Sequence, residues 1–155
     1  MIETMSLISK ILPPENVVLD AESTSKKRVF ERAGILFENQ LQIARSKVFD
    51  SLFAREKLGS TGLGHGVAIP HGRVKGLRDA VGAFFKAQNP IAFDAPDGQP
   101  VSLIFVLLVP ERATDLHLQI LGELAQMFSD RNFREQLQSA DSPAAMHQLL
   151  VNWKA

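Results

Sequence analysis

The stretch VSLIFVLLV, residues 101–109, is almost continuously apolar and rich in β-branched side chains. Such a run is typical of a strand that is buried on both faces at the centre of a sheet. Before it, apolar residues 91–93 are followed by Asp97 and Gly98, a pair that favours a hairpin turn. Because a hairpin joins antiparallel strands, we expect a sheet that is not purely parallel.

Other strand and helix patterns extend outwards from this central strand. Apolar runs predict further strands at about residues 17–19, 67–69 and 80–87. Helical spacing of apolar side chains predicts helices at about residues 23–39, 44–57, 114–129, 132–137 and 142–152. Ser23 and Ser25 are candidate N-caps of the first helix, and Pro143 lies just inside the last. This order predicts an α/β fold in which helices flank a mixed sheet on both faces, a three-layer sandwich.

Composition excludes several classes of protein. The 155 residues, 45% of them hydrophobic, suit one domain over residues 1–155. Lys plus Arg and Asp plus Glu number 17 each, so the chain lacks the basic excess of a nucleic-acid binder. There is no cysteine, which excludes disulfides and thiolate metal sites and fits a reducing compartment. With neither a transmembrane run nor a signal-peptide pattern, we expect a cytoplasmic protein without membrane insertion.

The segment GSTGLGHGVAIPHGR, residues 59–73, holds the most chemical information. Four glycines fall within residues 59–66, a density typical of a loop whose backbone N–H groups approach an anion closely. The segment lacks the Gly-Lys-Ser/Thr ending of a P-loop and the strand that precedes a dinucleotide-binding motif. A phosphate-lining loop and a plain loop without a ligand both remain open at this point.

His71 is the strongest candidate for a reacting side chain. It stands between Pro70 and Gly72, directly after a predicted strand. Proline fixes the approach of the chain and glycine removes side-chain bulk, so we expect an exposed imidazole on a rigid base. A neutral imidazole is a competent nucleophile near pH 7, because its ordinary pKa is about 6.5. An exposed histidine without a function is the alternative interpretation.

His117 is the second candidate. Thr114 or Asp115 is expected to cap its helix, which places His117 within the first turn. The positive end of a helix disfavours the imidazolium form and attracts phosphate. A polar residue at a helix start, without a function, is the alternative.

The other two histidines give weaker signals. His65 would complete a three-histidine metal site with His71 and His117, but its spacing matches no known ligand pattern. His147 lies on the last predicted helix, where a surface or packing role is expected. No pair of acidic residues stands out as an acid–base couple, and the Gly-x-Ser-x-Gly motif of serine hydrolases is absent.

The segment FAREKLGSTGLGHGVAIPHGR, residues 53–73, resembles the active-site signature of a known family. This is the enzyme IIA family of the bacterial phosphoenolpyruvate-dependent phosphotransferase system, fructose/mannitol class, and its nitrogen-regulatory branch (IIA-Ntr) is the closest match. The similarity continues through DAPDGQPVSLIFVLLVP (94–110) and DLHLQILGELAQMF (115–128). The resemblance implies the same three-layer fold.

The resemblance also assigns roles to individual residues. It implies that His71 is the phosphorylated residue, His117 the second active-site histidine and Arg55 their basic partner. By the same resemblance, Ser60, Thr61 and Gly62 lie in the loop that lines the phosphate. His65 is not part of the pattern and is given no role.

The function implied is that of a histidine phosphocarrier. His71 would accept a phosphoryl group from a small HPr-like protein, and the phosphorylation state would regulate partner proteins. No metal or other cofactor is required, because transfer between two histidines conserves the type of P–N bond. We expect the donor to dock on an apolar rim that includes Leu63 and Leu118.

Two alternative functions remain. One is a sugar-specific IIA component that passes phosphate to a fructose/mannitol-type IIB domain. The other is a binding module that is not phosphorylated, or a metal-dependent enzyme that uses His65, His71 and His117.

Overall fold

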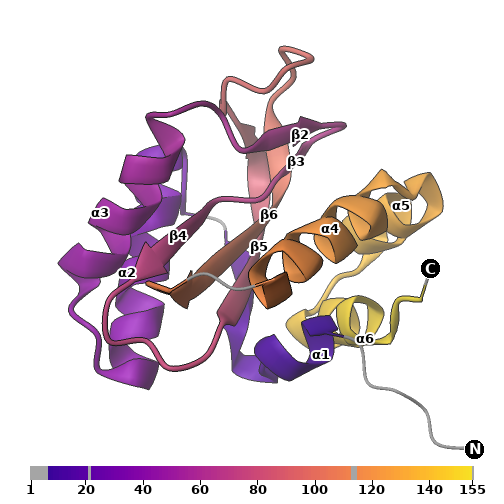
Figure 1. Cartoon of the computed structure of the whole chain (residues 1–155). Coiled ribbons are helices and arrows are strands. Elements are labelled where there is room, and N and C mark those ends of the chain that lie inside the picture. Colours follow the sequence, from indigo (N-terminus) through magenta and orange to yellow (C-terminus); the bar gives the residue numbers. More distant parts are fainter. Residues whose placement is uncertain (1–6, 21, 113–114, 155) are drawn as a thin grey trace, which may run out of the picture.

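The computed structural model describes residues 7–20, 22–112 and 115–154. In these residues, six strands alternate unevenly with helices (Figure 1). The strands are β1 (Val17–Asp20), β2 (Gly62–Gly64), β3 (Val67–Ala68), β4 (His71–Val74), β5 (Val81–Ile91) and β6 (Val101–Pro110). The helices are α1 (Leu7–Ile11), the 3₁₀ turn η1 (Pro14–Asn16), α2 (Lys26–Leu41), α3 (Arg45–Glu56), α4 (Asp115–Ser129), α5 (Arg131–Ser139) and α6 (Pro143–Asn152).

The strands form one mixed sheet in the order β1-β5-β6-β3-β2, and β4 also pairs with β6. Strand β6 is central, as predicted, and forms the expected antiparallel hairpin with β5. Strands β3 and β4 both run parallel to β6 on its other side, at successive positions along it. The sheet is therefore mixed, as the hairpin signal indicated.

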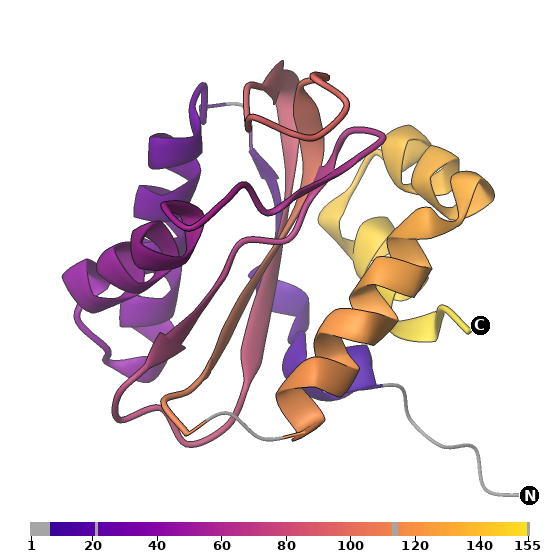
Figure 2. The ribbon, with the colours of Figure 1, turned by 45° about the horizontal axis from the view of Figure 1, so that its top comes forward.

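Helices cover both faces of the sheet (Figure 2), so the predicted three-layer architecture is confirmed. Helices α2 and α3 pack on one face, and α1, α4, α5 and α6 pack on the other. Each face of the sheet has its own hydrophobic core. Alternate residues of β6 belong to the two cores, because successive side chains of a strand point to opposite faces. Phe105 and Leu107 contact the core under α4, while Ile104 and Val106 contact the core under α2 and α3.

Serine side chains cap two of the helices, and one of these caps was predicted. Oγ of Ser25 accepts a hydrogen bond from the Arg28 amide, so Ser25 and not Ser23 caps α2. Ser142 caps α6 in the same way, with Pro143 as its first residue. Asp115 is the first residue of α4 and therefore not its cap, and Thr114 lies outside the described residues.

The glycine-rich segment differs from the prediction of a loop. Gly62–Gly64 forms β2, which pairs with β3 in a tight hairpin. His65 and Gly66 occupy its turn, with φ angles of 56° and 80°. Two consecutive positive φ angles are the requirement of a type I′ turn, which matches the twist of the strands. The prediction missed this hairpin because a short glycine strand carries no apolar alternation.

Candidate functional site

The sequence predicted that His71 directly follows a strand. In the structure, His71 lies at an interruption of the sheet. Strand β3 ends at Ala68 and β4 begins at His71. Between them, the carbonyl of Pro70 accepts a hydrogen bond from the Leu107 amide at 2.9 Å. Nδ1 of His71 lies 2.9 Å from the carbonyl oxygen of Ile69. A carbonyl only accepts hydrogen bonds, so Nδ1 carries the proton and Nε2 keeps its lone pair.

The other side of His71 is fixed by contact between helix α3 and strand β4. A Cβ atom on Gly72 would lie 2.2 Å from Oγ of Ser51 and 2.9 Å from its carbonyl oxygen, so a larger residue would push α3 away from β4. The Ser51 hydroxyl donates a hydrogen bond of 2.6 Å to the carbonyl of Arg73. Position 72 therefore needs a residue without a side chain, as predicted, because helix α3 packs closely against it.

His117 lies beside His71. The centroids of the two imidazole rings are 6.1 Å apart, and the ring planes are inclined by 80°. His71 is consequently half-buried, where the sequence predicted an exposed ring. Nδ1 of His117 is buried and has no hydrogen-bond partner among the described residues. His117 is in the first turn of α4, as predicted, and the fold brings together two residues that are 46 positions apart.

Both imidazoles are held in the neutral form at neutral pH. Burial lowers the pKa of His71 below the ordinary value of 6.5, and the nearby Arg55 guanidinium lowers it further. The hydrogen bond to Ile69 and the Glu56 carboxylate oppose this shift without cancelling it. Burial also lowers the pKa of His117, with smaller contributions from His71 and Arg73. A lowered pKa keeps the lone pair available to attack an electrophile.

Arg55 supplies positive charge close to His71. It lies in the last turn of α3, and its side chain is partly buried. Its Nη1 donates a hydrogen bond of 2.8 Å to the carbonyl of Gly59. This contact directs the guanidinium towards the start of the glycine-rich segment and leaves its other N–H groups for an anion.

Ser60 and Thr61 use their hydroxyl groups to hold that segment in place. Oγ of Ser60 donates to the carbonyl of Phe93 at 2.6 Å and accepts from the Gly62 amide at 3.1 Å. Thr61 is buried, and its Oγ1 donates to Glu56 at 2.6 Å. A Cβ atom on Gly62 would lie 2.8 Å from Cβ of Ala95, so this glycine permits a close approach of two backbones.

Glu56 is the residue at this site that sequence reasoning missed. It is buried, whereas the sequence analysis gave no acidic residue a role. A signal was present, because Val48, Leu52 and Glu56 are four residues apart and share the buried face of α3. A carboxylate on an apolar helix face needs hydrogen-bonding partners, which indicates a structural or chemical role.

The hydrogen bonds of His65 and His147 are to residues other than His71 and His117. His65 is at the tip of the β2–β3 hairpin, where its amide donates to the Asp97 carboxylate at 2.9 Å. Nε2 of His147 contacts the carbonyl of Leu12 at 2.9 Å. In residues 7–20, 22–112 and 115–154, no group of three or more His, Asp or Glu side chains is arranged to hold a metal ion. His65 therefore does not join His71 and His117 in such a group.

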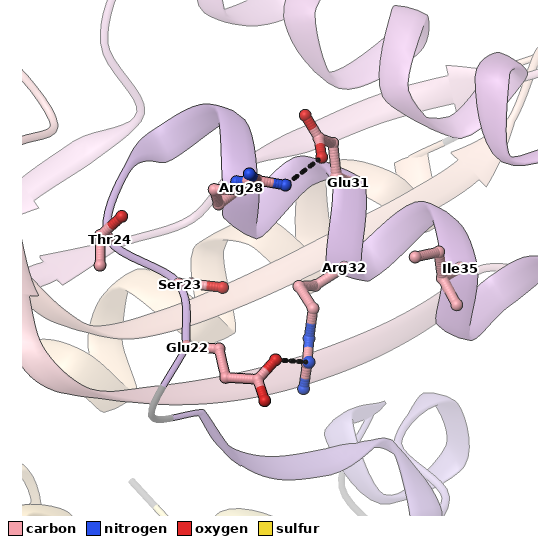
Figure 3. A pocket seen from close by; sticks show the side chains of 7 residues that line it. All are labelled: Glu22, Ser23, Thr24, Arg28, Glu31, Arg32 and Ile35. Carbon is pink, nitrogen blue, oxygen red and sulfur yellow. Dashed lines mark hydrogen bonds and ion pairs between the residues drawn. The ribbon is translucent and has the colours of Figure 1, made fainter.

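Two cavities differ in whether they adjoin the histidines. One of about 240 Å³ adjoins the site and is lined in part by His117, Leu116, Arg78 and Arg112. Another of about 400 Å³ lies at the start of α2 and contains none of the histidines (Figure 3). Its charged side chains pair with each other, Arg28 with Glu31 and Arg32 with Glu22. The first cavity therefore belongs to the site, and the second does not.

Comparison with known proteins identifies the family. A family model described as the phosphoenolpyruvate-dependent sugar phosphotransferase system, EIIA 2, matches residues 10–153. The chain belongs to this family. The resemblance of residues 53–73 to the IIA signature is thereby confirmed.

Within the IIA family, the chain is similar to proteins named for nitrogen regulation. It is 42% identical over 149 residues to a nitrogen regulatory protein of Pseudomonas aeruginosa, covering 96% of this chain and 97% of the relative. A nitrogen regulatory protein of Escherichia coli is 40% identical over 152 residues, with 97% and 93% covered. The crystal structure of the nitrogen regulatory protein IIA-Ntr from Neisseria meningitidis superposes with a TM-score of 0.89 at 55% identity, covering 94% of this chain and 99% of that one. These similarities confirm the predicted resemblance to the nitrogen-regulatory branch of the IIA family.

The segments that carry the candidate site also carry exposed leucines. Leu63 on β2 is 43% exposed, and Leu118 in the first turn of α4 is 69% exposed. Leu58, just after α3, and Leu116, beside His117, are exposed as well. Exposed apolar side chains such as these are available for contact with a protein partner.

None of the helices in the described residues combines the length and the apolar character that crossing a lipid bilayer demands.

Proposed function

We propose that this IIA protein is a histidine phosphocarrier that accepts a phosphoryl group on Nε2 of His71 from an HPr-like phosphocarrier, and that its phosphorylation state regulates partner proteins. The observation that carries the proposal is the contact between Nδ1 of His71 and the Ile69 carbonyl. It leaves Nε2 as the nucleophilic atom of a neutral ring. The same proposal takes residues 1–155 as one domain that acts in the cytosol without nucleic acid or metal.

The transfer step exchanges one P–N bond for another. The lone pair of Nε2 attacks the phosphorus of the donor's phosphohistidine in line with the bond that breaks. The bonding electron pair returns to the imidazole of the donor, which carries a proton on its other nitrogen and therefore leaves as a neutral ring. His71 keeps its Nδ1 proton on the Ile69 carbonyl throughout, so the positive charge that develops on its ring is stabilised by that contact.

The negative charge on the transferring oxygens needs donors around them. Arg55 supplies a guanidinium with free N–H groups, and neutral His117 supplies one further N–H group. In the glycine-rich segment, the amides of Gly62 and His65 already donate to Ser60 and Asp97, so further donors come from the other amides of residues 62–66. Ser60 and Thr61 contribute by holding this segment, since their hydroxyls are bonded within the protein.

The regulatory part follows from the charge that phosphorylation adds. A phosphoryl group brings about −1.5 to −2 charges at neutral pH. Among exposed leucines, such a charge penalises any partner that docks an apolar or acidic surface there. A penalty of about 1.4 kcal/mol weakens binding tenfold, so about 3 kcal/mol makes a usable switch.

A second candidate is transport, with His71 passing its phosphate to a IIB domain. A fructose-specific EIIA component of Haloferax volcanii is 32% identical over 145 residues, which favours this alternative. The higher identity to nitrogen regulatory proteins favours regulation.

The experiment is labelling by a phosphorylated HPr-like donor. We expect an acid-labile and base-stable label on the wild-type protein and none on His71→Ala. Label of the same amount on His71→Ala would contradict the proposal. Calorimetry of a partner with unphosphorylated, phosphorylated and His71→Ala protein then separates the two functions. Equal affinities for all three would overturn the regulatory part and leave the transport carrier.

A further inference from the structure

Glu56 is a buried carboxylate that the transfer step does not use. Its side chain is 4% exposed, and it is the last residue of α3. Its Oε2 accepts a hydrogen bond of 3.0 Å from the Thr61 amide, and its Oε1 accepts one of 2.6 Å from the Thr61 hydroxyl. A buried carboxylate is tolerated when its oxygens are fully bonded, so these contacts account for its burial.

Lys26 holds the same carboxylate from helix α2. Its Nζ lies 3.1 Å from Oε2 of Glu56, and its side chain is 17% exposed. The ammonium also lies 5.0 Å from the centre of the Phe93 ring. Phe93 in turn accepts the hydrogen bond from Ser60 through its carbonyl. Two helices and the segment after β5 thus converge on the residues just before β2.

From Thr61, hydrogen bonds continue to the imidazole of His71. The carbonyl of Thr61 accepts from the Ile69 amide at 2.9 Å. The carbonyl of Ile69 accepts from Nδ1 of His71, also at 2.9 Å. Three consecutive contacts therefore link the Glu56 carboxylate to the ring, through Thr61 and Ile69. Linked hydrogen bonds strengthen one another when each member is satisfied.

We propose that Glu56 is a positioning residue for His71: held by Lys26, its carboxylate fixes Thr61, and Thr61 fixes the Ile69 carbonyl that orients the imidazole ring. The inference rests on the proposed function only for what the ring does after it is oriented. The orientation itself is a property of the unphosphorylated protein and is measured without a donor.

Replacement of Glu56 by glutamine isolates this role. Three donors converge on the carboxylate, namely the Thr61 amide, the Thr61 hydroxyl and the Lys26 ammonium. A glutamine side chain offers one acceptor oxygen and adds two N–H donors. Thr61 is consequently released, and the Ile69 carbonyl loses its fixed position relative to the ring.

The first readout is the tautomer of His71, measured from imidazole ¹⁵N shifts of the full-length protein near pH 7.5. In the wild type, we expect Nδ1 to be protonated and Nε2 to be bare. In Glu56→Gln, we expect the two shifts to approach each other as both tautomers become populated. Thr61→Val, which removes only the hydroxyl contact, should change them in the same direction by less.

Glu38→Gln is the matched control. Glu38 also accepts a backbone N–H and pairs with a cation, in both cases from Arg45. None of the contacts that lead to His71 includes it, so its substitution should leave the His71 shifts unchanged. Wild-type shifts in a folded Glu56→Gln protein would overturn the proposal. If that variant does not melt cooperatively, wild-type shifts in Thr61→Val would overturn it instead.

The second readout is the rate of phosphorylation. Misplacement of a reacting group by about 1 Å costs about 10²-fold in rate. We therefore expect kcat to fall by up to about that factor in Glu56→Gln, with KM for the donor unchanged because the exposed leucines are intact. A raised KM with unchanged kcat would contradict a positioning role. If the wild type accepts no phosphate, the proposed function fails, while the ¹⁵N shifts still decide the role of Glu56.

Discussion

Replacing Gly72 with alanine tests the close packing of helix α3 on the strand that carries His71. The new Cβ would lie 2.2 Å from Oγ of Ser51 and 2.9 Å from both its carbonyl carbon and oxygen. The hydroxyl can rotate away, but the helix backbone can only separate from the strand. Overpacking of this kind costs about 1–3 kcal/mol. At about 2–4 °C per kcal/mol for a domain of this size, Tm should fall by about 2–12 °C.

The matched substitution is Gly122→Ala, inside α4, where a Cβ would meet no atom within 4 Å. Alanine in a helix interior is more favourable than glycine by about 0.5–1 kcal/mol, so this variant should melt slightly above the wild type. Thermal unfolding followed by circular dichroism measures both variants. A Gly72→Ala protein that melts at or above the wild-type Tm would refute the packing argument.

Three further predictions concern the site. Arg55→Ala and His117→Ala should each slow phosphorylation of His71 by about 10²–10³ and leave the fold intact. Each removes one hydrogen-bond donor to the transferring phosphoryl group. An unchanged labelling rate would show that the replaced residue is not part of the site. Because the pKa values of His71 and His117 are lowered in the folded protein, the stability linked to them is complete above pH 6.5 and is lost as pH falls through the folded values. Urea unfolding between pH 5 and 7 should show stability rising with pH, less steeply in a His71→Ala/His117→Ala double variant; equal slopes would contradict the shifts. Leu118→Glu should raise KM for the donor about tenfold or more, whereas Leu19→Glu, an exposed leucine on β1, should not, and equal KM values would place docking elsewhere.

Much of the fold was readable from local patterns. The central strand and the hairpin before it were predicted because apolar runs and turn residues are local signals. Strand β4 was missed because its pairing with β6 joins residues far apart in sequence and carries no local signature. Pro70 was the available clue. It has no amide donor for the strand ladder, so it interrupts the pairing between the end of β3 and the start of β4.

The sequence predicted which residues form the site but not how they contact one another. His71 and His117 were selected from their neighbours and from the family signature, yet their approach to 6.1 Å depends on where α4 packs. The tautomer of His71 depends on one carbonyl, that of Ile69, which only the interrupted strand exposes. Glu56 escaped notice because a carboxylate is usually solvated, and its burial is explained by contacts with Thr61 and Lys26 that the sequence does not show.

The most direct test of the central claim is ³¹P–¹⁵N NMR of the wild-type protein after phosphorylation by an HPr-like donor. The structure leaves Nε2 of His71 free and holds Nδ1 on the Ile69 carbonyl. We therefore predict a single phosphorus signal coupled to Nε2 of His71, with Nδ1 still protonated. Coupling to Nδ1, or a phosphorus signal on any other residue, would contradict the account.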